Sequence, residues 1–357
     1  MIGESFVLDA VVHGYNFAPE NQKGGVLCQQ LVGMIYHGFH CGFQPRGQSQ
    51  WILDAYRFMH GADPALLSHA LFAESQTDAC IYHGVPVYGM FADGGSPLWV
   101  GKEMRERYPG RVLLYGPISP WQPGALEEVD RLVEEEGVVG LKLYPMDLIE
   151  GEIKNFHMDD PEVAFPIFER AQAKGIRSIA IHKAIPLGPV PIEPFQPTDV
   201  QSAAAAFPNL TFEIVHGGFA YLEETALQVA RFPNIAINLE GSGAYLANAP
   251  RKFAELIGTF LFWGGADRII WATGSILLHP RPFIEAFWNF QMPDDLVNDY
   301  GFPPLTNEMK RGILGGNIAR ILGLDVEAMK QAAAGDEFAA RTDLAAPWSG
   351  TPALADR

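Results

Sequence analysis

The sequence predicts an α/β fold, a (β/α)8 barrel of parallel strands with a long insertion after the first strand. Three observations support this prediction. Eight short apolar segments alternate with helical patterns along the chain, which is the order that βαβ units produce. Several of these segments end in a histidine, as expected where barrel strands deliver side chains to a shared site. No Gly-x-Gly-x-x-Gly motif follows an early strand, so a doubly wound open sheet is the less favoured alternative.

The predicted strands are continuous apolar runs, which is typical of parallel strands that are buried on both faces. They cover residues 6–12, 79–82, 111–115, 138–143, 178–182, 210–215, 235–239 and 268–273. Helices are predicted between them, at residues 64–76, 102–108, 121–136, 161–175, 198–207, 222–232 and 249–258. Asp63 and Pro64 give the first of these helices a start signal, because Asp caps well and Pro suits the first turn.

The chain is predicted to form one barrel domain over residues 1–330, followed by a C-terminal tail over residues 331–357. Residues 14–55 form an insertion that is several times longer than the usual connection of ~2–6 residues after a barrel strand. The insertion is rich in aromatic side chains, namely Tyr15, Phe17, Tyr36, Phe39, Phe43 and Trp51. Extra chain at this face of a barrel tends to be functional, so we expect a lid that selects the substrate.

Composition excludes several classes of partner. The formal net charge is −17, whereas nucleic acids and anionic membranes attract basic surfaces. No apolar run approaches the ~18 residues of a membrane span. Cys28, Cys41 and Cys80 have no Cys-x-x-Cys spacing, which favours a reducing cytoplasm. We therefore expect a cytoplasmic protein that acts on a small molecule.

Three histidines stand at the carboxyl ends of predicted strands. His13 follows the first strand, His182 ends the fifth, and His216 ends the sixth, directly before two glycines. Because the carboxyl ends of barrel strands share one face, the three imidazoles are predicted to converge. Each alone is as readily explained as a satisfied core histidine, but the repetition favours a site.

Four stretches carry a resemblance to the amidohydrolase-related family that includes aminocarboxymuconate-semialdehyde decarboxylase, γ-resorcylate decarboxylase and several lactone hydrolases. They are Gly-Leu-Lys-Leu-Tyr-Pro at 140–145, Val-His-Gly-Gly at 215–218, Trp-Ala-Thr-Gly-Ser at 271–275 and Gly-Gly-Asn-Ile-Ala-Arg-Ile-Leu-Gly-Leu at 315–324. The resemblance covers about residues 5–325. It implies a barrel, a small-molecule substrate, a divalent metal and a homodimer.

The departures from the family pattern concern the metal. The resemblance places metal ligands at positions that Val11 and Gly274 occupy here, and neither residue has a donor atom in its side chain. His13, His182 and His216 would remain, and three imidazoles suffice for Zn²⁺ or another divalent metal. We expect an impaired metal site, in which Gly274→Asp would strengthen metal binding if the remaining ligands are aligned. Asp9 is expected to be a buried structural partner rather than a ligand.

Further polar residues are placed near the predicted mouth. We assign His182, His216, Glu240 and His279 as catalytic candidates, because strand-end imidazole and carboxyl groups can exchange protons near neutral pH. Candidate substrate-binding residues are Lys142, Tyr36, His40, Ser275 and Arg281. Lys142 and Arg281 would hold a carboxylate, and Glu240 in an apolar pocket would have a raised pKa.

The leading hypothesis is a decarboxylase-type lyase acting on a small aromatic or unsaturated carboxylic acid, without a required metal. A carboxyl group beside the metal is needed for ordinary metal-water hydrolysis, and Gly274 does not provide one. The second hypothesis is a hydrolase of a lactone or amide with a three-histidine metal site. The third, from another class, is a barrel that has lost catalysis and survives as a binding or scaffold subunit.

Overall fold

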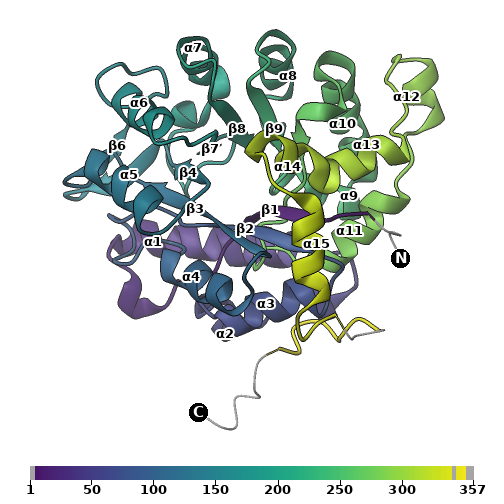
Figure 1. Ribbon diagram of the computed structural model, residues 1–357, viewed down its shortest axis with the longest axis horizontal. Helices are drawn as coiled ribbons and strands as arrows, with labels where there is room; N and C mark the ends of the chain where they lie inside the picture. Colours follow the sequence, from purple (N-terminus) through teal and green to yellow (C-terminus); the bar gives the residue numbers. More distant parts are fainter. Residues whose placement is uncertain (1–4, 340–342, 351–357) are drawn as a thin grey trace.

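Eight parallel strands form the barrel, as predicted (Figure 1). The computed structural model describes residues 5–339 and 343–350. In sheet order the strands are β1 (Leu8–Val12), β2 (Ala79–His83), β3 (Val112–Ile118), β4 (Gly140–Leu143), β7 (Ser178–His182), β8 (Thr211–Val215), β9 (Ile235–Asn238) and β10 (Ile269–Ile270). The barrel closes beyond the short β10, where the Gly274 N–H donates to the Val11 carbonyl over 2.9 Å and Val12 bridges to Ser275.

Helices surround the strands. They are α1 (Gly25–Gly33), α2 (Ala55–Met59), α3 (Pro64–Phe72), α4 (Leu98–Arg107), α5 (Ala125–Glu134), α6 (Phe165–Ala173), α7 (Val200–Ala206), α8 (Leu222–Arg231), α9 (Tyr245–Asn248), α10 (Pro250–Gly264), α11 (Pro280–Asn289), α12 (Asp294–Asn298), α13 (Asn307–Arg311), α14 (Asn317–Leu322) and α15 (Val326–Ala334). The Asp63 carboxylate accepts from the N–H groups of Ala65 and Leu66, so the predicted cap of α3 is present.

Two apolar layers hold the barrel. The larger lies between the strands and the helices, and the smaller fills the barrel interior with small and branched side chains such as Ala10, Val11, Ala180, Val215 and Ala236. The residues of β1, β2 and β7 are buried throughout. Burial on both faces explains why the strands are continuous apolar runs, since each fully buried large side chain contributes about 1.5–3 kcal/mol.

The third strand runs further than predicted. The sequence prediction ended it at Tyr115, before Gly116 and Pro117, but β3 continues to Ile118 and pairs Pro117 with Lys142 of β4. The pairing of β3 with β2 ends at Tyr115. No β2 residue lies opposite Pro117, so the missing proline N–H leaves no gap in that ladder.

The sequence prediction missed an antiparallel hairpin after β4. Strands β5 (Met146–Ile149) and β6 (Glu152–Asn155) are joined at Glu150 and Gly151, both with positive φ. Two such residues form the tight turn that hairpins favour. The insertion also contains more regular structure than predicted, since α1 continues directly into a π-helical segment, Met34–Cys41. No helix in the described part of the chain is both long and apolar enough to cross a membrane.

Candidate active site

An apolar cavity lies at the carboxyl ends of the strands, beneath the insertion. The space in it that water-sized molecules can occupy is about 60 Å³, and about 620 Å³ is free of atoms when the open solvent at its mouth is included. Its walls come from the insertion, the loop after β2, the loop after β7 and the strand ends. The lining side chains that matter below are Tyr15, Phe17, Phe39, Tyr144, His182, His216 and Glu240. The predicted lid segment thus contributes walls, and the polar groups gather on one side of an otherwise apolar space.

His182 and His216 form a contacting pair at the ends of β7 and β8. Their facing nitrogens, His182 Nδ1 and His216 Nε2, are 3.0 Å apart. The other nitrogens face carbonyl groups: His182 Nε2 is 2.7 Å from the Ile185 oxygen and His216 Nδ1 is 3.0 Å from the Glu240 oxygen. Three contacts need three N–H protons, whereas two neutral rings carry two. With both rings neutral, the two facing nitrogens therefore both carry lone pairs, and the contact between them has no proton.

Glu240 completes the polar side of the cavity, and His13, which does not itself line the cavity, lies beside it. His13 Nδ1 donates to the carbonyl of His83 over 3.0 Å, which leaves Nε2 facing Glu240 Oε1 at 3.6 Å. Glu240 Oε2 lies 3.9 Å from His216 Nδ1. His13 and His216 thus both lie near the Glu240 carboxyl group, and His182 contacts His216. Burial lowers the pKa of all three imidazoles, so they are neutral at pH 7.

Glu240 is a buried carboxyl group at the cavity wall. It follows β9 and is 2 % exposed, and its Oε2 atom has no hydrogen-bond partner among the described residues. Burial raises the pKa of Glu240 to about 7, although Lys142 opposes the shift. A carboxyl group with this pKa is present in both its acid and its carboxylate form at neutral pH, as general acid–base catalysis requires.

Lys142 lies inside the barrel, behind the cavity wall. Its side chain on β4 is fully buried, and its Nζ atom has no hydrogen-bond partner in the described part of the chain. Burial lowers the pKa of Lys142 to about 8, whereas Glu240 and Glu213 oppose the decrease. Glu213 accepts hydrogen bonds from Tyr115, Ser178 and Asn238. The ammonium group therefore acts on the site through its charge, and the predicted direct contact with substrate is not seen in the cavity lining.

His83 is a site residue that the sequence prediction missed. It ends β2, its ring stacks on Tyr115 and it lies at the edge of the His13 ring. Burial, followed by the charge of Lys142, lowers its pKa. The signal that could have found it is the one that identified the others, a histidine at the end of an apolar strand.

Several predicted residues do not line the cavity. The His40 ring connects the insertion to the loop after β10, because Nδ1 donates to the Leu277 oxygen and Nε2 accepts from the Leu53 N–H. Tyr36 packs beside His40 and donates to the Leu53 carbonyl. Ser275 is buried in the seam between β1 and β10, where its carbonyl accepts from the His13 N–H. All three residues thus have structural contacts in this state of the protein.

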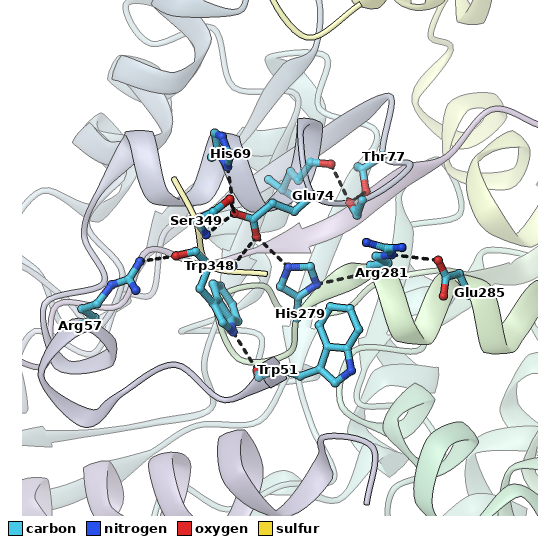
Figure 2. A network of polar contacts seen from close by, with 12 residues as sticks. Trp51, Arg57, His69, Glu74, Thr77, His279, Arg281, Glu285, Trp348 and Ser349 are labelled. Atoms are coloured by element: carbon cyan, nitrogen blue, oxygen red, sulfur yellow. Dashed lines mark hydrogen bonds and ion pairs between the residues drawn. The ribbon is translucent and has the colours of Figure 1, made fainter. Parts of the chain in front are cut away.

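His279 and Arg281 belong to a separate network at the start of α11 (Figure 2). His279 Nε2 donates to Glu74 over 2.9 Å, and Arg281 pairs with Glu285. Glu74 also accepts from His69 and from the N–H groups of Trp348 and Ser349. Trp348 in turn donates its indole N–H to the Trp51 carbonyl. The network therefore fastens residues 348–349 to the barrel and to the insertion, away from the cavity lining.

The residues present do not fit the metal site that the sequence resemblance implies. Val11 is buried in the barrel interior, and Gly274 has no side chain. Across residues 5–339 and 343–350, no group of three or more His, Cys, Asp or Glu side chains is placed to hold a metal ion. His182 and His216 offer at most two facing nitrogens, which is fewer than the three protein ligands usual in a catalytic zinc site.

Comparison with known proteins gives the family. A family model described as amidohydrolase matches residues 38–324, so the chain belongs to the amidohydrolase family. None of the curated proteins matches the chain in sequence. The sequence resemblance is therefore confirmed at the level of the family.

Solved structures confirm the fold. An uncharacterised TIM-barrel protein from Bordetella bronchiseptica has 17% identity and a TM-score of 0.60, with 89% of this chain and 98% of that chain covered. A 2,6-dihydroxybenzoate decarboxylase from Rhizobium has 15% identity and a TM-score of 0.54, with 89% and 99% covered. A 5-carboxyvanillate decarboxylase from Novosphingobium aromaticivorans, complexed with manganese and 4-hydroxy-3-methoxy-5-nitrobenzoic acid, has 13% identity and a TM-score of 0.51, with 90% and 97% covered.

Proposed function

We propose that this protein is a lyase that removes CO2 from a small aromatic or unsaturated carboxylic acid, with Glu240 as the proton donor. The observation that carries the proposal is a buried carboxyl group with a pKa of about 7 at the wall of an apolar cavity. Membership of the amidohydrolase family and the likeness to two barrels named as decarboxylases of aromatic acids support the same chemistry.

The aromatic walls select the substrate. Phe17, Phe39 and Tyr144 line the cavity, and a flat ring can pack against such side chains. Burial, with the charge of Glu240, raises the pKa of the Tyr15 and Tyr144 hydroxyl groups well above their usual range. Both phenols therefore stay protonated and can donate hydrogen bonds to the substrate carboxylate, while the Lys142 charge offsets the burial of that anion.

The reaction needs one proton delivered to carbon. The Glu240 carboxylic acid donates its proton to the ring carbon that bears the carboxylate, and the ring becomes a cationic intermediate. The bond between that carbon and the carboxylate then breaks, its electron pair returns to the ring, and CO2 leaves. Glu240 is left as a carboxylate and regains a proton from water.

The hydrolase with a three-histidine metal site is the alternative. The facing nitrogens of His182 and His216 favour it, because a cation between them would satisfy both lone pairs. The incomplete ligand set weighs against it. A scaffold without catalysis would not explain a buried Lys142 without a hydrogen bond, nor a carboxyl group of raised pKa at the cavity wall.

We further propose that the protein is a cytoplasmic homodimer. The support is that Cys28, Cys41 and Cys80 are free thiols and that the sequence resembles a family of dimers. Light scattering coupled to size-exclusion chromatography would measure the mass in solution, and a monomer at micromolar concentration would contradict the dimer.

The activity test uses 2,6-dihydroxybenzoate and 5-carboxyvanillate as probes, with CO2 release and product formation measured together. We expect conversion of at least one probe by the wild-type protein and a loss of about 10²–10⁴-fold in Glu240→Gln. Asp147→Asn is the matched control, because Asp147 is another buried carboxyl group with a raised pKa but does not line the cavity. Equal activity of Glu240→Gln and wild type would contradict the assignment.

A further inference from the structure

The Lys142 side chain places a charged group in an unusual position, inside the barrel. The ammonium group is fully buried and lacks a hydrogen bond, and no carboxylate of the described residues lies within ion-pair distance of it. Lys183, the other fully buried lysine at the strand ends, is by contrast paired with Asp199 at 2.7 Å. Apart from the face of the Tyr144 ring, 5.4 Å away at its centroid, the ammonium group has no partner among the described residues. Burying a charge without a hydrogen bond or an ion pair is unfavourable, so stability alone does not explain the Lys142 side chain.

The groups around Lys142 are those of the site. Its Nζ atom lies 5.4 Å from the centroid of the Tyr144 ring, which lines the cavity. Its positive charge also lowers the pKa of His13, His83, His182, His216 and Glu240. A fixed cation in a water-poor environment stabilises negative charge much more than it would in water. The same cation repels a divalent metal ion that enters the site.

Gly274 and Glu240 compete for one space. A Cβ atom on Gly274 would lie 2.7 Å from Glu240 Oε1 and 3.0 Å from its Cγ, and contacts of 2.7 Å are too short for a carbon atom. Gly274 also has a φ of +67°, which side-chain-bearing residues rarely adopt. The Glu240 carboxyl group, carried by the end of β9, thus occupies the volume into which a side chain at position 274 would project.

We propose that the Lys142 ammonium is the resident cation of this site in place of a divalent metal ion, and that the Glu240 carboxyl group replaces a side chain at position 274. Lys142 is a positioning residue, because it acts through Glu240 and through its charge rather than by contact with substrate. The catalytic part of the inference rests on the proposed function, whereas the metal and steric parts do not. The Gly274→Asp change that the sequence favoured for restoring metal is blocked while Glu240 is in place.

The first experiment needs no substrate. Chelator-treated protein is titrated with MnCl2 and with ZnCl2 by calorimetry, and we expect no stoichiometric binding by the wild type. Melting temperatures are then compared for Gly274→Ala, Glu240→Ala and the double variant. Gly274→Ala should lower the melting temperature by several degrees in the wild-type background and by less in the Glu240→Ala background. Tight metal binding would overturn the metal part, and equal effects in both backgrounds would overturn the steric part.

The second experiment tests Lys142. Lys142→Met keeps most of the length of the side chain and removes the charge, so we expect an equal or higher melting temperature together with at least a 100-fold loss of probe conversion. Propylammonium chloride should partly restore conversion by Lys142→Ala, and potassium chloride should not. A lower melting temperature of Lys142→Met with no rescue would show a structural role and overturn the inference. If the wild type converts no probe, the proposed function fails. The melting temperatures and the metal titrations still test the steric and metal parts of the inference.

Discussion

Glu240 owes its properties to its surroundings rather than to its own chemistry. The carboxyl group lies against Gly274, near His13 and His216, and is shielded from water. Burial favours the neutral acid, whereas the Lys142 charge favours the carboxylate. Since the two effects oppose one another, the pKa is held near neutral pH, where a proton can be both given and regained.

This balance predicts the pH dependence of the reaction. Glu240 must be the acid form to donate a proton, and its pKa is about 7, so the turnover rate should fall about tenfold per pH unit above that value. The measurement is kcat for the converted probe between pH 5.5 and 9. Glu240→Gln should lack this descending limb. A rate that rises between pH 7 and 8 would instead indicate that the carboxylate acts as a base, as in the hydrolase alternative.

Strand position made part of the site predictable. His13, His182, His216 and Glu240 were predicted as site residues because each lies at or just after the end of an apolar strand, and parallel strands end on one face. His40 and His279 could not be separated from them, since their partners, Leu277 and Glu74, are more than 200 residues away in sequence. The close approach of Gly274 and Glu240 likewise depends on how the ends of β9 and β10 pack against each other. No local sequence pattern predicts this packing.

The insertion has two kinds of aromatic side chain. Phe39 lines the cavity and stacks on Phe43 at a centroid distance of 5.4 Å. Tyr36 lies earlier in the same π-helical segment by less than one turn, packs against His40 and Phe58, and does not line the cavity. The same helical segment thus carries a candidate substrate contact on one side and a packing contact on the other.

This difference gives a matched pair of variants. Phe39→Ala should weaken binding of a converted probe, seen as a raised KM, while the melting temperature stays within a few degrees. Tyr36→Ala should leave KM nearly unchanged and lower the free energy of unfolding, by less than the about 3–5 kcal/mol of a fully buried aromatic because Tyr36 is half-buried. Steady-state kinetics and urea unfolding separate the two effects. A stability loss with unchanged KM in Phe39→Ala would contradict the lid.

The elements that the sequence did not predict have their causes in tertiary contacts. The β5–β6 hairpin lacks a continuous apolar run, because all residues of β6 are exposed. The π-helical segment Met34–Cys41 is anchored by the buried His40. Trp348 is buried only because Glu74, Trp51 and His279 surround it. In each case the stabilising partner is remote in sequence or the segment is solvated, so periodicity gives no signal.

At the scale of the whole molecule, the barrel buries an unusual number of titratable groups. Six of the ten histidines have a pKa lowered mainly by burial, namely His13, His40, His83, His182, His216 and His279. Four carboxyl groups have a pKa raised mainly by burial, namely Asp9, Asp78, Asp147 and Glu240. The two sets act on stability in opposite directions as the pH changes.

Below neutral pH, we expect the buried histidines to affect the free energy of unfolding more than the buried carboxyl groups do. In the unfolded chain they take up protons below pH ~6.5, whereas in the folded protein they stay neutral, so their contribution to stability is lost as the pH falls. The buried carboxyl groups keep their protons in the folded state, and their contribution is instead lost as the pH rises toward 7. There are two more of these histidines than of these carboxyl groups. Each additional proton that the unfolded chain binds relative to the folded protein changes the free energy of unfolding by about 1.4 kcal/mol per pH unit.

We therefore predict that the free energy of unfolding is greatest near pH 7 and falls by about 2 kcal/mol between pH 6.5 and 5.5. Urea unfolding followed by tryptophan fluorescence at half-unit pH steps measures it. His40→Gln is an informative variant, because it removes a histidine whose pKa is about 4 in the folded protein and which lies outside the cavity lining. The free energy of unfolding of this variant should change less steeply with pH than that of the wild type, by the equivalent of about one bound proton. Stability that stays level or increases toward pH 5 would mean that the buried carboxyl groups outweigh the histidines.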